Sequence, residues 1–81
     1  MELQDTINLM TSSDYKERFK AEFYQTTIRF DKLSAMLEKW DKNELNFKPT
    51  CPREIYDYQL KGMKEYIDML IIRAKIENIE L

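Results

Sequence analysis

Histidine is absent from this 81-residue sequence, and cysteine and glycine occur once each. Without histidine the chain cannot form a Ser-His or Cys-His catalytic dyad or a Cys/His zinc site, and it lacks the usual near-neutral general base. The single cysteine, Cys51, cannot form an internal disulfide. We therefore expect a protein that is not an enzyme and that uses no metal or other cofactor.

Long apolar runs are also absent, because no stretch approaches about 18 consecutive apolar residues. The N-terminus has no basic region followed by an apolar run, so we expect a cytoplasmic protein without a membrane span or a secretion signal. The 13 Lys and Arg residues nearly balance the 15 Asp and Glu residues, which gives a formal net charge of −2. Duplex nucleic acid normally binds a basic face and is therefore not the expected partner.

The composition is typical of helices, because two prolines and one glycine supply few of the turn-forming residues that connect strands. Residues 1–10 form a weakly patterned lead-in segment, and a cluster of helix-capping residues follows at 11–14. From Phe19 to Trp40, positions at alternating spacings of four and three are apolar, with Thr26 as the one polar exception. This pattern predicts a helix over about residues 14–41.

Residues 42–51 break the pattern, and Pro52 suits the first position of a second helix, where a missing N–H is tolerated. Asn78 can adopt the left-handed conformation that ends helices, which leaves a short tail at 78–81. The predicted second helix spans about 52–77, and its apolar positions are Tyr56, Leu60, Met63, Ile67, Leu70 and Ala74. Residues 11–81 then form one domain, an all-α antiparallel two-helix hairpin.

The run Met69 to Ile72 is apolar around most of the helix circumference, whereas a hairpin covers only one side of each helix. A chain of this length also has a small core. We therefore expect self-association into a homo-oligomeric helical bundle. Near the loop, we expect Trp40, Phe47 and Pro49 to cap the open end of the core; the alternative is a loop that closes over a ligand.

One flank of the predicted hairpin combines residue types that suit recognition. Tyr66 and Arg73 lie one heptad apart on the second helix, near Gly62, and Arg29 and Lys32 lie opposite on the first. An aromatic plane beside guanidinium groups suits a nucleotide-like anion. Tyr, Met and Arg are also common at protein interfaces, so this flank is a ligand pocket, an interface between chains, or both. The candidate ligand-binding residues are Arg18, Arg29, Lys32, Gln59, Tyr66 and Arg73.

Three segments, residues 13–39, 45–52 and 59–81, resemble the small helical-hairpin proteins of bacteriophages, including those of crAss-like phages. That group is similar to the phage sponges that oppose CBASS and Thoeris defence by sequestering cyclic nucleotide and cyclic ADP-ribose signals. The most telling part is the second-helix pattern of Gln59, Leu60, Met63, Tyr66, Leu70 and Arg73.

The resemblance implies a homo-oligomer, commonly a hexamer, in the cytosol of the host bacterium. It implies that cyclic ADP-ribose isomers or cyclic di- or trinucleotides bind between subunits without being cleaved. It assigns ligand binding to Gln59, Tyr66 and Arg73, which stand in the matching pattern, whereas Arg18, Arg29 and Lys32 follow from the predicted helix pairing. The alternative is a small dimeric helical module that binds another protein and has no small-molecule ligand.

Overall fold

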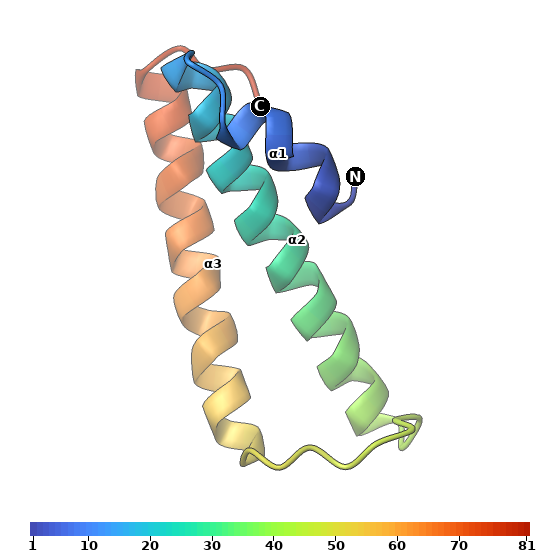
Figure 1. Ribbon diagram of the computed structural model, residues 1–81. Coiled ribbons are helices and arrows are strands. Elements are labelled where there is room, and N and C mark those ends of the chain that lie inside the picture. The colour runs from blue at the N-terminus through green and yellow to red at the C-terminus, as the bar shows by residue number, and fades with distance from the viewer.

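The computed structural model describes residues 1–81 and contains helices only, which confirms the all-α class (Figure 1). A 3-10 helix, η1 (Leu3–Thr6), leads into the short helix α1 (Ile7–Met10), and two long helices follow, α2 (Tyr15–Asp41) and α3 (Arg53–Ile76). The helices predicted over 14–41 and 52–77 correspond to α2 and α3. None of the helices has both the length and the apolar content needed to span a lipid bilayer.

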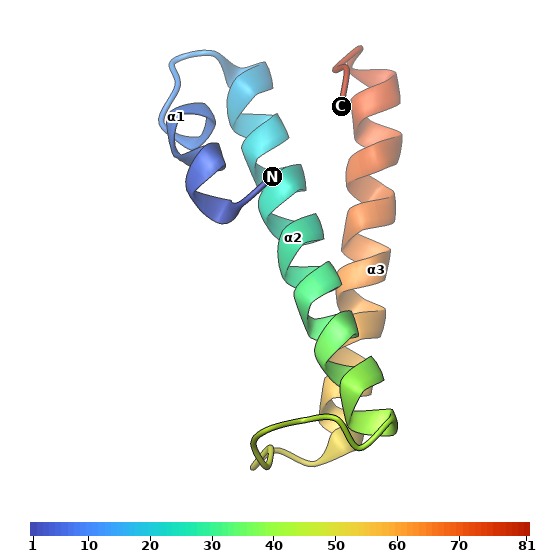
Figure 2. The ribbon, with the colours of Figure 1, turned by 90° about the vertical axis from the view of Figure 1, so that its right-hand side faces the viewer.

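α2 and α3 lie side by side and run in opposite directions, joined by residues 42–52 (Figures 1 and 2). The main core cluster lies where α2 begins and α3 ends, and it consists of Phe19, Leu70, Ala74 and Ile79, with Phe23 packed against it. The first three belong to the apolar stripes that the spacing indicates, and Ile79 follows α3. Only 8 of the 81 residues are buried, so a single chain has a thin core that leaves much apolar surface in contact with water.

Both long helices end with an asparagine in the left-handed conformation. Asn43 (φ 57°) follows α2 and Asn78 (φ 58°) follows α3, the latter as predicted. The N–H of Glu44 donates to the carbonyl of Lys39 (2.9 Å), and the N–H of Ile79 donates to the carbonyl of Ala74 (2.8 Å). These are the bonds of the Schellman motif. After α3 the motif turns the chain back so that Ile79 reaches the core.

The starts of the long helices differ in how they are capped. The Asp14 carboxylate accepts a hydrogen bond from the N–H of Lys16 (2.9 Å), as expected for a helix N-cap. Pro52 precedes the first residue of α3 instead of occupying it, since its ψ of 143° is extended. The first turn of α3 begins with a bond from the N–H of Ile55 to the carbonyl of Pro52 (3.1 Å).

Residues 1–12 pack against α2 on the side away from α3, and η1 and α1 make no contact with α3 (Figures 1 and 2). Thr6 is only 1% exposed, and its Oγ1 donates to the Leu3 carbonyl (2.7 Å) and accepts from Gln25 Nε2 (2.9 Å). The lead-in segment is therefore folded. Its two helical elements have four residues each, which is too short for apolar periodicity to indicate them.

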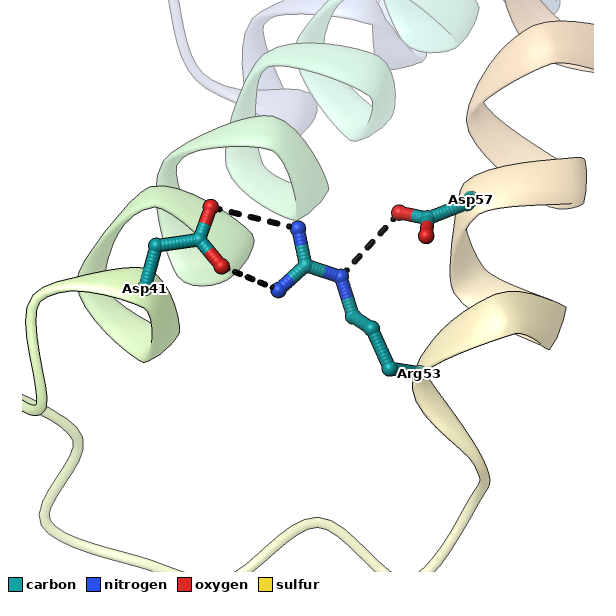
Figure 3. A network of polar contacts seen from close by, with 3 residues as sticks. All are labelled: Asp41, Arg53 and Asp57. Carbon is teal, nitrogen blue, oxygen red and sulfur yellow. Dashed lines mark hydrogen bonds and ion pairs between the residues drawn. The ribbon is translucent and has the colours of Figure 1, made fainter.

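At the loop end of the molecule, Arg53 connects the end of α2 to the start of α3 (Figure 3). Its guanidinium donates to both carboxylate oxygens of Asp41 (2.5 and 3.3 Å) and to Asp57 (3.0 Å). These bonds lower the pKa of Asp41 and raise that of Arg53. Arg53 also lies over the Trp40 ring, 5.3 Å from its centroid, and Trp40 meets the Tyr56 ring edge-on at 6.0 Å.

Candidate ligand-binding surface

The predicted flank contains two contacts between α2 and α3. The Tyr66 hydroxyl on α3 donates a hydrogen bond to Glu22 on α2. One heptad further along α3, Arg73 Nη2 donates to the Tyr15 hydroxyl (2.9 Å), and Tyr15 lies one heptad before Glu22 on α2. The two helices run in opposite directions, so seven residues forward on α3 correspond to seven residues back on α2. The two contacts therefore belong to the same alignment of the helices. Tyr66 and Arg73 therefore lie along the same side of the α2–α3 pair.

Arg73 is held in a closed network of polar groups. Its Nε donates to Glu77 Oε2 (3.2 Å), and the Tyr15 hydroxyl donates to Glu77 Oε1 (2.7 Å). The hydrogen bonds from Tyr15 and Arg73 lower the pKa of Glu77, and the bond to Glu77 raises the pKa of Tyr15. The guanidinium carbon also lies 4.9 Å from the centroid of the Phe19 ring. An anion that binds Arg73 must compete with Glu77 or use Nη1, which makes no hydrogen bond.

The three candidate cations on α2 lie next to the N-terminal segment. Arg18 Nη1 donates to the Ser12 carbonyl (2.8 Å). Arg29 lines a cavity of about 280 Å³ between this segment and α2, and Lys32 Nζ lies 3.9 Å from Glu2 Oε2. Residues 1–12 therefore lie beside these three cations. The predicted pairing of α2 with α3 does not by itself indicate this arrangement.

Gln59 is exposed on α3 and makes no side-chain hydrogen bond within the chain. Among the six candidates, only Arg29 and Lys32 line cavities, and these are different cavities. The structure thus places Tyr66 and Arg73 on one flank and Arg18, Arg29 and Lys32 beside residues 1–12. The six residues do not surround a common pocket in a single chain.

Three residues that contact Tyr66 or Arg73 on this flank, Glu22, Glu77 and Tyr15, were not among the candidates. Glu77 neutralises Arg73, and its position four residues later on the same helix face is a sequence signal for such a pair. Tyr15 accepts from Arg73, and its position one heptad before Glu22 places it on the same stripe of α2. Neither position by itself predicts that the tyrosine bridges the arginine and the glutamate.

The rings near the loop have separate roles. Trp40 packs against Tyr56 and Arg53 at the open end of the helix pair. Phe47 is 52% exposed and lines two cavities, of about 360 and 300 Å³, the second of which Pro49 also lines. Trp40 thus packs at the loop end of the helix pair as expected, whereas Phe47 is exposed and does not cap this end. No group of three or more His, Cys, Asp or Glu residues is placed to hold a metal ion.

The model of the Sequestin family matches residues 13–76. The chain belongs to the Sequestin family. The Sequestin match covers α2 and α3 and includes all six candidate residues, whereas η1, α1 and Glu77 lie outside it. The family name suggests a sequestering function. No curated protein and no solved structure matches the chain.

Proposed function

We propose that this chain sequesters a cyclic nucleotide-type defence signal, either a cyclic ADP-ribose isomer or a cyclic di- or trinucleotide, on behalf of a phage in the bacterial cytoplasm. The Sequestin match over residues 13–76 carries the proposal, because the family name suggests sequestration. The chemistry of the α3 flank supports the choice of ligand class.

Tyr66 and Arg73 supply the two kinds of contact that a nucleotide needs. Tyr66 is 44% exposed, so its ring is accessible for a base to stack on, and Arg73 offers planar donors to a phosphate one heptad away. Within the chain, Glu22 and Glu77 bind these two side chains. The two carboxylates preorganise the site, and the phosphates of the ligand take the place of Glu77 at Arg73.

Sequestration requires tight binding and no turnover. The sequence has no histidine and hence no general base of the usual kind for hydrolysing a phosphodiester near neutral pH. A preformed site lowers the entropic cost of binding, which serves a protein that must reduce the free concentration of its ligand. We therefore propose that the ligand is released chemically unchanged.

We further propose that the functional unit is a homo-oligomer, for example a hexamer, formed through the face of α3 that points away from α2. This face carries a row of exposed apolar side chains at helical spacing, in two groups: Ile55 and Tyr58 come before Gly62 and Glu65, and Met69, Ile72 and Ile76 come after them. Gly62 lies in the same row, and a Cβ there would meet nothing within 4 Å, so a second helix has room to approach closely. A second chain would cover this row and add the wall that one chain lacks around Tyr66 and Arg73.

The test is incubation with a panel of cyclic dinucleotides, cyclic trinucleotides and cyclic ADP-ribose isomers, followed by removal of free ligand and release of bound ligand by heat. Recovery of an intact panel member supports sequestration, recovery of a cleaved product would show an enzyme, and no retention of any member would overturn the proposal. In the last case, a stable dimer would favour the alternative of a protein-binding module.

Two variants test whether the site lies on the α3 flank. Arg73→Ala and Tyr66→Ala should each lower retention at least tenfold, because each removes one of the two contact types, while the helicity and mass of the assembly stay unchanged. Lys75→Ala is the matched control, because it removes a cation from the same last turn of α3. If both variants retained ligand as well as Lys75→Ala does, the site would not be on this flank.

A further inference from the structure

The two largest cavities of the chain lie at the loop end, away from Tyr66 and Arg73. One measures about 360 Å³, between the last turns of α2 and residues 44–47, and the other about 300 Å³, between Trp40 and residues 43–49. Phe47 lines both. Each volume reaches the lower end of the range typical of small-molecule sites, which suits a ligand unit of one nucleotide.

Phe47 is an aromatic side chain left in water at 52% exposure. It makes no aromatic contact within the chain, in contrast to Trp40, which packs against Tyr56 and Arg53. Core packing therefore does not account for this ring. An accessible aromatic face between two hollows is a place where a nucleobase can stack, and such stacking is tolerant of base identity.

Two of the three lysines that line these cavities form no ion pair within the chain. Lys39 lines the first cavity and Lys48 the second, and neither lies within 4.0 Å of a carboxylate oxygen. Lys32, also in the first cavity, has only Glu2 at 3.9 Å. By contrast, Arg53 and Arg73 each hold a carboxylate at 3.2 Å or less. Glu44 is the one acidic residue lining these cavities, so lysines outnumber it.

We propose that the loop end is a second binding site of this chain, for an aromatic anion of the nucleotide class. The base stacks on Phe47, and Lys39 and Lys48 bind the phosphates from either side. The inference rests on the proposed function for its ligand class and places one binding event at residues 39–48, separate from the α3 flank. A molecule with two nucleotide units has a base for each of the two cavities that share Phe47.

Trp40 gives this site its own signal, because it is the only tryptophan and it lines the second cavity. Titration with cyclic AMP, cyclic di-AMP and cyclic ADP-ribose should quench Trp40 fluorescence saturably for at least one probe. Inorganic phosphate alone should not, because it cannot stack. Binding of the same probes, measured by isothermal titration calorimetry on the wild type and on the variants below, gives a second readout.

Phe47→Leu keeps apolar volume but removes the aromatic plane, and Lys39→Ala/Lys48→Ala removes both phosphate contacts. Each should weaken the fluorescence-detected binding at least tenfold, about 1.4 kcal/mol. Lys61→Ala/Lys75→Ala is the matched control, because it removes two exposed lysines far from the loop and should leave binding unchanged. Circular dichroism should show unaltered helicity in all three variants, since the replaced side chains are exposed.

Two outcomes would overturn the inference, and they differ in what they say of the proposed function. If a probe binds, Trp40 does not respond, and the loop variants bind like the control, the loop-end site is wrong while sequestration stands. If neither calorimetry nor fluorescence detects any probe, the loop-end site fails, and the panel incubation described above decides whether the proposed function fails as well.

Discussion

At the scale of single residues, Arg73 shows how a predicted ligand contact changes once its neighbours are known. The residue lies on the flank that carries Tyr66, but its charge is shared with Glu77 and the Tyr15 hydroxyl. An anionic ligand at Arg73 therefore gains less than it would at a free guanidinium, because it must first displace a carboxylate. By the same reasoning, Lys39 and Lys48 are better placed to bind an anion without such a cost.

The lowered pKa of Glu77 leads to a prediction about pH. Ionised Glu77 stabilises the folded chain, so its contribution is fully present above the ordinary value of 4.5 and is lost as the pH falls through the lowered, folded-state value. Glu77→Gln removes the charge. The difference in free energy of unfolding between wild type and Glu77→Gln should therefore be constant near neutral pH and shrink below about pH 4.5. Urea unfolding followed by circular dichroism over a pH series measures it.

Glu80→Gln is the control for this experiment, because Glu80 is an exposed acid three residues after Glu77 and has no ion pair. Its effect on stability should stay small at every pH. A difference between wild type and Glu77→Gln that persists unchanged to pH 2.5 would contradict the role of the charge and leave only a packing effect.

At the scale of elements, the ends of the helices follow from local chemistry. Asp14 precedes α2 as an N-cap, and asparagines follow both long helices in the left-handed conformation that this residue type tolerates. These signals depend on a few neighbouring residues, so the sequence indicates them well. The packing of η1 and α1 on α2 depends instead on contacts such as Thr6 with Gln25, which no local pattern encodes.

Replacement of Asn78 tests the role of the C-terminal turn. Asn78→Ala should destabilise the chain by about 1–2 kcal/mol, because alanine tolerates a positive φ poorly, whereas Asn78→Gly should be nearly neutral. Urea unfolding gives the free energies, and near-ultraviolet circular dichroism reports the packing of the aromatic rings.

Asn43 provides a matched comparison, since its φ of 57° is almost the same but the following Glu44 is exposed. Asn43→Ala should carry the backbone cost without disturbing the core, whereas Asn78→Ala should also loosen the contact of Ile79 with Phe19 and Leu70. Equal effects of the two substitutions on stability and on the aromatic signal would show that Ile79 adds nothing to the cluster.

At the scale of the whole molecule, a thin core and an exposed apolar row on α3 belong together. The core cluster lies at one end of the helix pair, Arg53 and Trp40 connect the other, and the outward face of α3 has no partner within the chain. Exposed apolar side chains gathered on one face of a helix are typical of a binding interface. This supports the proposed assembly, in which a second chain would complete the pocket.

Gly62→Ala separates the isolated chain from the assembly. Within one chain the substitution should raise the free energy of unfolding by about 0.5–1 kcal/mol, because alanine favours a helix and nothing lies near the added methyl group. If a second helix packs closely at Gly62, the same methyl group should weaken self-association. Urea unfolding at low concentration measures the first effect and sedimentation equilibrium the second.

The two measurements should therefore move in opposite directions. Lys61→Ala, at the neighbouring position, is a control that should leave the association constant unchanged. Stabilisation of the chain by Gly62→Ala with no change in association would exclude a close helix contact at this residue. Any second chain on the outward row of α3 would then pack less closely there.

The sequence by itself determined the all-helical class, the approximate limits of α2 and α3, and the asparagine that ends α3, because apolar periodicity and capping act within one or two helical turns. Only the tertiary structure decided which charges are neutralised and which rings stay exposed. Tyr15 meets Glu77 across 62 residues of sequence, and Phe47 stays in water beside two hollows. Such contacts depend on how the helices pack against each other, and local spacing along the chain does not encode that geometry.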